Sequence, residues 1–86
     1  MTWYTYIARC RDDSLYTGIT PDLQRREWLH NHKKGAKSLL GKLPVKIIYS
    51  EKFVNRILAA KREREIKRWK REKKLNLIRT HSLRSV

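Results

Sequence analysis

Residues 15–30, LYTGITPDLQRREWLH, change from a strand pattern to a helix pattern within three residues, and this change constrains the fold more than any other feature. In residues 15–19, Tyr16 and Gly18 alternate with Leu15, Thr17 and Ile19, as residues on the two faces of a β-strand do. The next three residues end the strand. Thr20 can cap a helix, Pro21 suits its first position, and Asp22 favours its positive end. We therefore expect a helix over about residues 21–31.

This helix presents one face on which functional side chains gather. Leu23, Arg26, Glu27 and His30 are spaced by three and four residues, so they lie on the same side of the helix. Tyr16 lies on the strand that leads directly into it. We therefore expect a tyrosine, an arginine and a histidine to be directed toward one region.

The start of the chain predicts a β-hairpin. Residues 2–10 are rich in aromatic and β-branched side chains, residues 11–14 are typical of a turn, and a second strand follows over residues 15–19. A loop with an odd number of residues would place Tyr6 opposite Gly18 and Ala8 opposite Tyr16. Each tyrosine would then face a small residue across the hairpin. A loop of two or four residues would exclude this pairing.

The remaining chain continues the alternation of elements. A basic loop over residues 32–37 precedes a third strand over residues 45–53, and Asn55 can cap a long helix over residues 56–70. A last short helix starts near Arg71 and includes residues 75–78. The order is strand, strand, helix, strand, helix, helix. We expect one domain over residues 1–79 and a flexible tail over residues 80–86.

The charge of the chain restricts its partners. With 22 Lys and Arg against 8 Asp and Glu, the formal net charge is +14 over 86 residues. Such a charge repels itself in a compact state, so a polyanionic partner is expected. Nucleic acid fits better than a membrane surface, because the aromatic residues are not gathered on a basic amphipathic helix. No apolar stretch is long enough to span a bilayer and no signal peptide precedes the first strand, so no membrane association is expected. The single Cys10, expected to be a buried apolar group, suits a cytoplasmic location.

The long second helix carries an acidic residue in an unusual position. Ala59, Glu63 and Ile66 recur at spacings of four and three, so Glu63 faces the same way as the apolar stripe. A carboxylate on the core side is costly unless a cation or hydrogen bonds meet it. We expect either an arginine, such as Arg26, or a metal ion to balance the charge of Glu63.

Taken together, the motifs of this chain resemble the GIY-YIG nuclease domain, and in particular small stand-alone bacterial GIY-YIG proteins of unassigned substrate. The first signature is Tyr4-Thr5-Tyr6, in which the last tyrosine agrees, and the second is Tyr16-Thr17-Gly18, which keeps both outer residues. The other matching residues follow in order: Asp22-Leu23, Arg25-Arg26, His30-Asn31, residues 33–37, Pro44-Val45-Lys46, Arg62-Glu63, Ile66-Lys67, Trp69-Lys70 and Lys74. The similarity extends to about Ile78.

The resemblance implies an α+β fold with a three-stranded antiparallel β-sheet flanked by helices, and a metal-dependent endonuclease that hydrolyses phosphodiester bonds. Glu63 would bind a single Mg²⁺ or Mn²⁺ ion, which needs few protein ligands. Tyr6 would activate the attacking water or accept its proton, with Arg26 and the metal lowering its pKa. Arg26 would neutralise charge on the phosphate, Tyr16 would hold the nucleophile or phosphate, and His30 would orient or relay a proton.

Nucleic acid, expected to be DNA in repair or recombination, would be bound through its backbone and shape. The basic residues expected to contact it are Arg25, Lys33, Lys34, Lys37, Lys67 and Lys70.

The same residues also have structural interpretations. The tyrosines could be sheet-packing aromatics, His30 a surface or capping residue, and the basic cluster a solvated helix face. Each tryptophan is expected in core or rim packing rather than as a base-stacking platform, although an exposed one could stack on a base. Residues 38–40 and 80–82 depart from the family pattern, and Asn76 is in poor register to replace the closing asparagine. A catalytically silent nucleic-acid-binding module that retains the fold is therefore the alternative function. The oligomeric state cannot be read from the residues.

Overall fold

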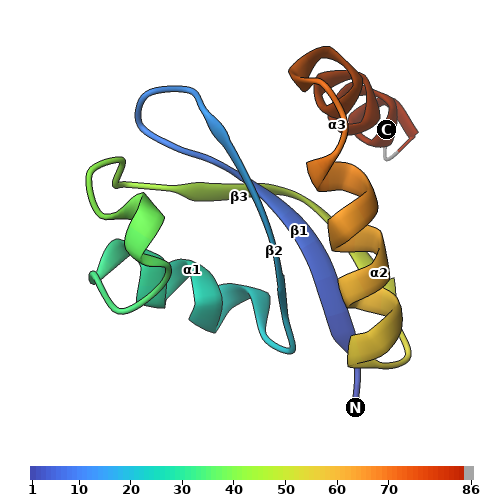
Figure 1. The fold of residues 1–86 in the computed structure, drawn as a ribbon, viewed down its shortest axis with the longest axis horizontal. Coiled ribbons are helices and arrows are strands. Elements are labelled where there is room, and N and C mark those ends of the chain that lie inside the picture. Colours follow the sequence, from blue (N-terminus) through green and yellow to red (C-terminus); the bar gives the residue numbers. More distant parts are fainter. Residues whose placement is uncertain (85–86) are drawn as a thin grey trace.

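The structure, a computed structural model, describes residues 1–84, and its elements follow the expected order (Figure 1). The strands form a three-stranded antiparallel sheet in the order β2-β1-β3, flanked by helices, so the expected fold class is confirmed. The elements are β1 (Trp3–Arg9), β2 (Leu15–Thr20), α1 (Leu23–Asn31), the 3₁₀ turn η1 (Lys37–Leu39), β3 (Lys46–Phe53), α2 (Arg56–Lys67) and α3 (Arg71–Arg84). None of the described helices is both long and apolar enough to cross a membrane.

The hairpin has the register expected from its sequence. Tyr6 pairs with Gly18 and Ala8 pairs with Tyr16, as an odd-numbered loop requires. Within that loop, the Asp12 carboxylate accepts hydrogen bonds from the backbone N–H of Ser14 at 3.0 Å and from its hydroxyl at 2.6 Å. The hairpin therefore directs the rings of Tyr6 and Tyr16 to one face of the sheet.

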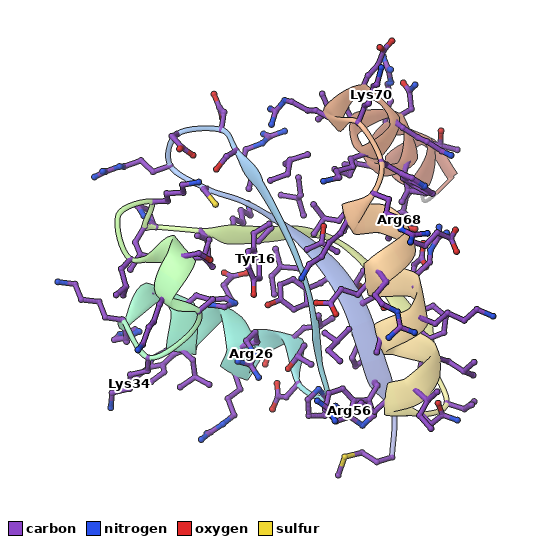
Figure 2. All side chains as sticks on the ribbon, in the orientation of Figure 1. Tyr16, Arg26, Lys34, Arg56, Arg68 and Lys70 are labelled. Atoms are coloured by element: carbon purple, nitrogen blue, oxygen red, sulfur yellow. The ribbon has the colours of Figure 1, made fainter. Side chains whose placement is uncertain are left out.

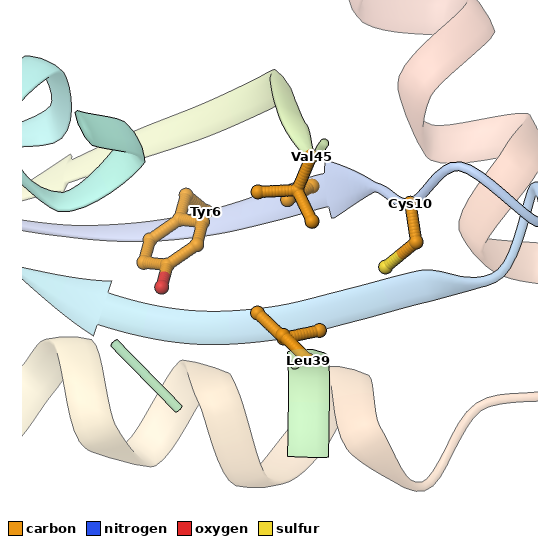
Figure 3. Packing of buried hydrophobic residues seen from close by; sticks show 5 residues of the cluster. Tyr6, Cys10, Leu39 and Val45 are labelled. Atoms are coloured by element: carbon orange, nitrogen blue, oxygen red, sulfur yellow. The ribbon is translucent and has the colours of Figure 1, made fainter. Parts of the chain in front are cut away.

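The sheet is covered on both faces by apolar clusters. One face carries Tyr6, Ala8 and Cys10, which pack with Leu39 and Val45 (Figure 3) and with Leu23 of α1. Cys10 is buried, as expected. The opposite face carries a second cluster made of residues from β1, β3, α2 and α3, namely Ile7, Tyr49, Ile66, Trp69, Leu77 and Ile78. The two clusters place α1 and α2 on opposite faces of the sheet.

The start of the first helix differs from the sequence expectation. The helix α1 begins at Leu23, and its N-cap is Asp22, whose side chain accepts from the N–H of Arg25 at 3.0 Å. Thr20, expected as the cap, instead accepts the N–H of Asp22 at 3.1 Å within the preceding turn, so Pro21 also lies outside the helix. Thr20 and Asp22 both carry a side-chain oxygen that could cap the helix, and Asp22, which is nearer the first turn, forms the cap.

The C-terminal region also differs. The helix α2 ends at Lys67 rather than near residue 70, because the chain turns there and brings Trp69 against the second apolar cluster. The helix α3 begins at Arg71 as expected but continues to Arg84, beyond the short helix that was expected. Residues 85–86 of the expected tail lie outside the described residues.

Polar side chains attach the helices to β3. Asn31 at the end of α1 binds the backbone of Val45 twice, accepting from its N–H at 2.7 Å and donating to its carbonyl at 2.9 Å. Glu27 accepts the N–H of Ile47 at 2.9 Å, so it serves the sheet edge rather than the region shared by Arg26 and His30. On the other face, Arg62 of α2 binds Glu51 of β3 through Nε at 2.8 Å and Nη2 at 3.0 Å.

Candidate active site

A hydrogen bond between two buried rings lies at the centre of the predicted site. The hydroxyl of Tyr6 is 2.8 Å from Nε2 of His30, and these residues are 1% and 2% exposed. The other ring nitrogen of His30, Nδ1, accepts the backbone N–H of Ala36 at 3.4 Å. The His30 proton therefore belongs on Nε2, which donates to the Tyr6 oxygen. His30 is thus not a surface residue, and the Tyr6 hydroxyl hydrogen is available to another acceptor.

Tyr16 completes a group of three neighbouring rings. Its ring centroid lies 5.6 Å from that of His30, edge to face, and 6.2 Å from that of Tyr6. Tyr16 is only partly buried, so it connects the buried pair to the surface. Figure 2 labels Tyr16, which comes from β2, and Arg26, which comes from α1.

Two glycines shape this region: Gly18, which the hairpin register predicted as the small residue opposite Tyr6, and Gly35, to which the sequence assigned no role. A β-carbon at Gly18 would lie 2.7 Å from the Tyr6 hydroxyl oxygen, and one at Gly35 would lie 2.1 Å from Nδ1 of His30. Neither glycine has a positive φ angle, so both are required for space rather than for backbone conformation. The hairpin register was sufficient to identify Gly18. The closure of the loop over His30 is non-local and left no sequence signal for Gly35.

Arg26 is directed toward the same region. Within the described residues its buried Nε makes no hydrogen bond, although buried polar atoms are rarely left unpaired. The positive charge of Arg26 lowers the pKa of both Tyr6 and His30. Burial lowers the pKa of His30 and the charge of Arg26 lowers it further, so His30 is neutral at pH 7. An anionic oxygen fits the unpaired Nε.

Tyr6 differs from the expectation that nearby cations would lower its pKa. Burial raises the pKa of Tyr6 well above 10, and Tyr16 and Glu63 raise it further. The Arg26 charge lowers the pKa but does not offset burial. Without further positive charge, Tyr6 therefore keeps its proton at neutral pH.

Glu63 of α2 lies on the inward-facing stripe, as expected from its spacing. Its neighbours on the stripe, Ala59 and Ile66, are fully buried, and its own side chain is 20% exposed. The cation that meets it within the described residues is Lys67, whose Nζ is 3.2 Å from Oε2, rather than Arg26. The helix α2 packs against β1 and β2, and the charge of Glu63 reaches the Tyr6 phenol, whose pKa it raises.

The Glu63 carboxylate is a ligand that suits a hard divalent cation. Such ions prefer oxygen ligands and can be bound through one or two carboxylates, with water and phosphate oxygens completing the shell. Glu63 is partly open to solvent, and its partner Lys67 is 52% exposed, so the lysine can move away. Glu63 is therefore the residue that can hold the ion.

The six basic residues expected to contact nucleic acid fall into two exposed groups. Arg25, Lys33, Lys34 and Lys37 belong to α1 and the loop after it, whereas Lys67 and Lys70 lie near the junction of α2 and α3 (Figure 2). A basic cleft of about 680 Å³ opens beside the second group. It is lined by Lys61, Arg64, Glu65, Lys67, Arg68 and Trp69.

Comparison with known proteins identifies the family. A family model described as the GIY-YIG catalytic domain matches residues 2–76. A UPF0213 protein of Staphylococcus saprophyticus is 47% identical over 75 residues, covering 87% of this chain and 92% of the relative. A UPF0213 protein of Haloquadratum walsbyi is 49% identical over 74 residues, covering 86% and 83%.

Solved structures agree with this match. The solution structure of a protein from E. faecalis superposes with a TM-score of 0.64 at 38% identity, covering 96% of this chain and 88% of that one. A UPF0213 protein from Bacillus halodurans gives a TM-score of 0.60 at 38% identity, covering 93% and 85%. The chain therefore belongs to the GIY-YIG family, whose nucleases bind nucleic acid and generally use a divalent metal.

Proposed function

We propose that this protein is a metal-dependent endonuclease that hydrolyses phosphodiester bonds in DNA. The observation that carries this proposal is the unpaired, buried Nε of Arg26 beside the hydrogen-bonded Tyr6–His30 pair. Such an arrangement suits a phosphate group, because a guanidinium compensates the negative charge that builds up on phosphate oxygens during hydrolysis. Family membership supports the same class of reaction.

The phenol of Tyr6 acts on the attacking water. His30 donates to the phenol oxygen, so it fixes the ring and favours the phenolate once the phenolic proton has left. The phenolic proton passes to solvent at the partly exposed edge near Tyr16. The phenolate then accepts a proton from the water as the water oxygen bonds to phosphorus, the P–O bond to the leaving nucleotide oxygen breaks, and that oxygen takes a proton from solvent. Because burial raises the pKa of Tyr6, this step requires positive charge near the oxygen, and Arg26 supplies part of it.

The remaining groups hold the substrate. The Tyr16 hydroxyl, at the partly exposed edge of the ring group, orients the water or a phosphate oxygen. Glu63 would hold the divalent ion, Mg²⁺ or Mn²⁺, which when bound supplies positive charge to the phosphate oxygens. The basic residues of both exposed groups bind the backbone of the DNA without reading its bases.

A plasmid-nicking assay over a series of metal ions tests this proposal. Replacing Glu63 by Gln or Arg26 by Ala should abolish metal-dependent nicking, while DNA affinity measured in a chelator changes by no more than about threefold. Glu65→Gln is the matched control, because Glu65 lies on the same helix but is 52% exposed and pairs with Arg62. Equal nicking by wild type and Glu63→Gln would contradict the role of Glu63.

The second candidate function is a catalytically silent nucleic-acid-binding module. It is favoured by the position of Asn76, which is exposed on α3 and accepts a hydrogen bond from Arg79 rather than closing the site. The same assay separates the two functions. Retention of a labelled duplex without cleavage under any divalent ion would establish the silent module.

A further inference from the structure

Trp28 is an exposed aromatic residue on the helix that carries Arg26 and His30. Its side chain is 51% exposed, whereas Trp3 and Trp69 are partly buried, so Trp28 is not a core residue. A single exposed indole is common on protein surfaces and does not by itself indicate a ligand. Its surroundings show what kind of contact it can make.

A second ring holds the indole in place from one side. The imidazole of His32 stacks on Trp28 with 3.9 Å between ring centroids and 15° between planes. Nδ1 of His32 lies 2.7 Å from the backbone carbonyl of Trp28, and since a carbonyl only accepts, Nδ1–H is the donor. The stacked pair is therefore fixed before any ligand arrives. Because His32 covers one face of the indole, the exposed part belongs to the other face and the edges.

The end of α1 also brings a cation to this pair. Lys33 has a φ angle of 61°, its N–H donates to the carbonyl of His30 at 3.2 Å, and the N–H of Lys34 donates to the carbonyl of Leu29 at 2.8 Å. This pattern is a Schellman motif, which reverses the chain at a helix end. As a result, Nζ of Lys34 lies 6.0 Å from the centroid of the Trp28 ring.

The hollow beside the indole has mixed polarity. It measures about 420 Å³ and is lined by Asp22, Gln24, Arg25 and Trp28. A carboxylate, an amide and a guanidinium together offer both donors and acceptors, which match the edges of a nucleobase. A phosphate group alone would be repelled by Asp22, so the hollow differs in character from the basic cleft beside α2.

We infer that Trp28 is a stacking platform for an unpaired nucleobase, and that the nucleic acid bound on this side of α1 therefore carries a single-stranded or unpaired nucleotide. This inference rests on the proposed nucleic-acid function and names its substrate class. A fully paired duplex keeps its bases stacked inside the helix and cannot offer one to an exposed indole. Arg25 and Lys34 bind the flanking phosphates.

The test measures binding in a chelator by fluorescence anisotropy, with a labelled single strand, a blunt duplex, and a duplex with a short single-stranded extension. Base–aromatic stacking contributes about 1–3 kcal/mol per base, so Trp28→Ala should weaken single-strand and extended-duplex binding by about 5- to 150-fold. Blunt-duplex affinity should change by less than about twofold, because that contact is electrostatic. Trp28→Tyr keeps an aromatic face and should retain most of the single-strand affinity.

Charge variants provide the matched control. Arg25→Ala and Lys34→Ala should weaken binding of all three probes by similar factors and reduce the salt dependence, since phosphate contacts do not distinguish paired from unpaired strands. If Trp28→Ala proves unfolded by circular dichroism, the comparison of Trp28→Leu with Trp28→Tyr replaces it. Quenching of tryptophan fluorescence by the single strand, measured with Trp3→Phe and Trp69→Phe combined, should also report stacking directly.

Equal losses for duplex and single strand, or no loss for the single strand, would overturn the inference, as would failure of the wild-type protein to bind any probe. Because no metal is present, these outcomes do not depend on cleavage. Selective loss in Trp28→Ala together with absent plasmid nicking would establish the platform while contradicting the proposed nuclease activity.

Discussion

Tyr6 and His30 share one hydrogen bond, and their surroundings leave these two rings almost no freedom. Gly18 lies under the phenol and Gly35 lies against the imidazole, each too close for a β-carbon. The N–H of Ala36 assigns the tautomer of His30, which in turn presents a donor to the phenol oxygen. The chemistry of the site thus depends on small residues and a backbone amide as much as on the ionisable side chains.

The first prediction concerns the space under the phenol. In Gly18→Ala the new methyl group would lie 2.7 Å from the Tyr6 hydroxyl oxygen, so the phenol must move. Since a displacement of about 1 Å can cost about 100-fold in rate, we expect plasmid nicking to fall by about that factor while DNA affinity is kept. Gly41→Ala is the control, because no heavy atom lies within 4 Å of its β-carbon position. Similar nicking rates for the two variants would contradict the close packing of Gly18.

The second prediction concerns pH and stability. Burial and the Arg26 charge lower the pKa of His30 in the folded protein, so the folded state binds fewer protons than the unfolded chain. The free energy of unfolding should therefore fall as the pH drops through the unfolded histidine value of about 6.5 and approach a lower plateau below the folded pKa. Protonation of His30 on Nδ1 would also break the hydrogen bond from the Ala36 N–H, because both groups would then be donors.

Urea unfolding at a series of pH values measures this effect. His30→Gln should reduce the loss of stability between about pH 7 and pH 5, because it removes the titrating group. Gln24→Ala, which removes no titrating group from an exposed position of the same helix, is the control and should keep the wild-type pH dependence. An unchanged profile in His30→Gln would show that another group carries it.

At the scale of elements, α1 is held by its two ends. Asp22 caps its start, and at its end Asn31 binds both backbone groups of Val45, the residue before β3. Glu27 adds a bond to Ile47 in β3. Arg26 and His30 lie between these attachments, so the polar contacts to the edge of the sheet set the position of the helix face that carries the proposed site.

The third prediction tests the attachment at the end of α1. Asn31→Ala leaves the N–H of Val45, a buried residue, without a partner, and such a loss costs about 1–3 kcal/mol. We expect the free energy of unfolding to fall by that amount in urea titrations. Asn76→Ala, at an exposed position of α3, should change it by less than about 0.5 kcal/mol. Equal effects at the two asparagines would show that the Val45 contact adds no stability.

The sequence predicted those elements whose determinants are local. The hairpin register follows from an odd loop and from alternation along two adjacent strands, and Asn55 caps α2 as expected, accepting from Leu58 at 2.9 Å. The start of α1 was placed too early because Thr20 and Asp22 are both good capping residues. The end of α2 was placed too late because no glycine or proline marks the turn. It is set by the packing of Trp69 on a distant cluster.

The candidate site, like the fold, was predictable only where local periodicity determines it. The periodicity of α1 placed Arg26 and His30 on one face, and the periodicity of α2 placed Glu63 inward. The burial of His30 depends on the loop at Gly35 and Ala36 closing over it, which no local pattern encodes. The pairing of Glu63 with Lys67 is local at a spacing of four, and it was missed because arginine and metal were the partners considered.

Over the whole molecule, the chain carries a net charge of +14, and its two basic groups belong to helices on opposite faces of the sheet. One basic group follows α1 and its loop, and the other lines the cleft at the junction of α2 and α3. A nucleic acid that contacts both groups must therefore reach both faces of the sheet.

The fourth prediction follows from this distribution. The double variant Arg64→Ala with Arg68→Ala should lower the slope of log Kd against log salt by about two, since each lost phosphate contact removes about one unit. The control is Arg11→Ala with Lys52→Ala, which removes the same charge from exposed positions outside the cleft. Equal slopes in the two double variants would show that net charge, rather than the cleft, governs binding.

The bonds from Asn31 and Glu27 to β3 have a consequence for exchange of amide hydrogens with deuterium. The amides of Val45 and Ile47 are bonded to side chains of α1 rather than to a neighbouring strand, so they exchange only when the helix lifts from the sheet or the whole domain unfolds. Their protection relative to the central β1 amides therefore reports directly on how often the catalytic helix departs on its own.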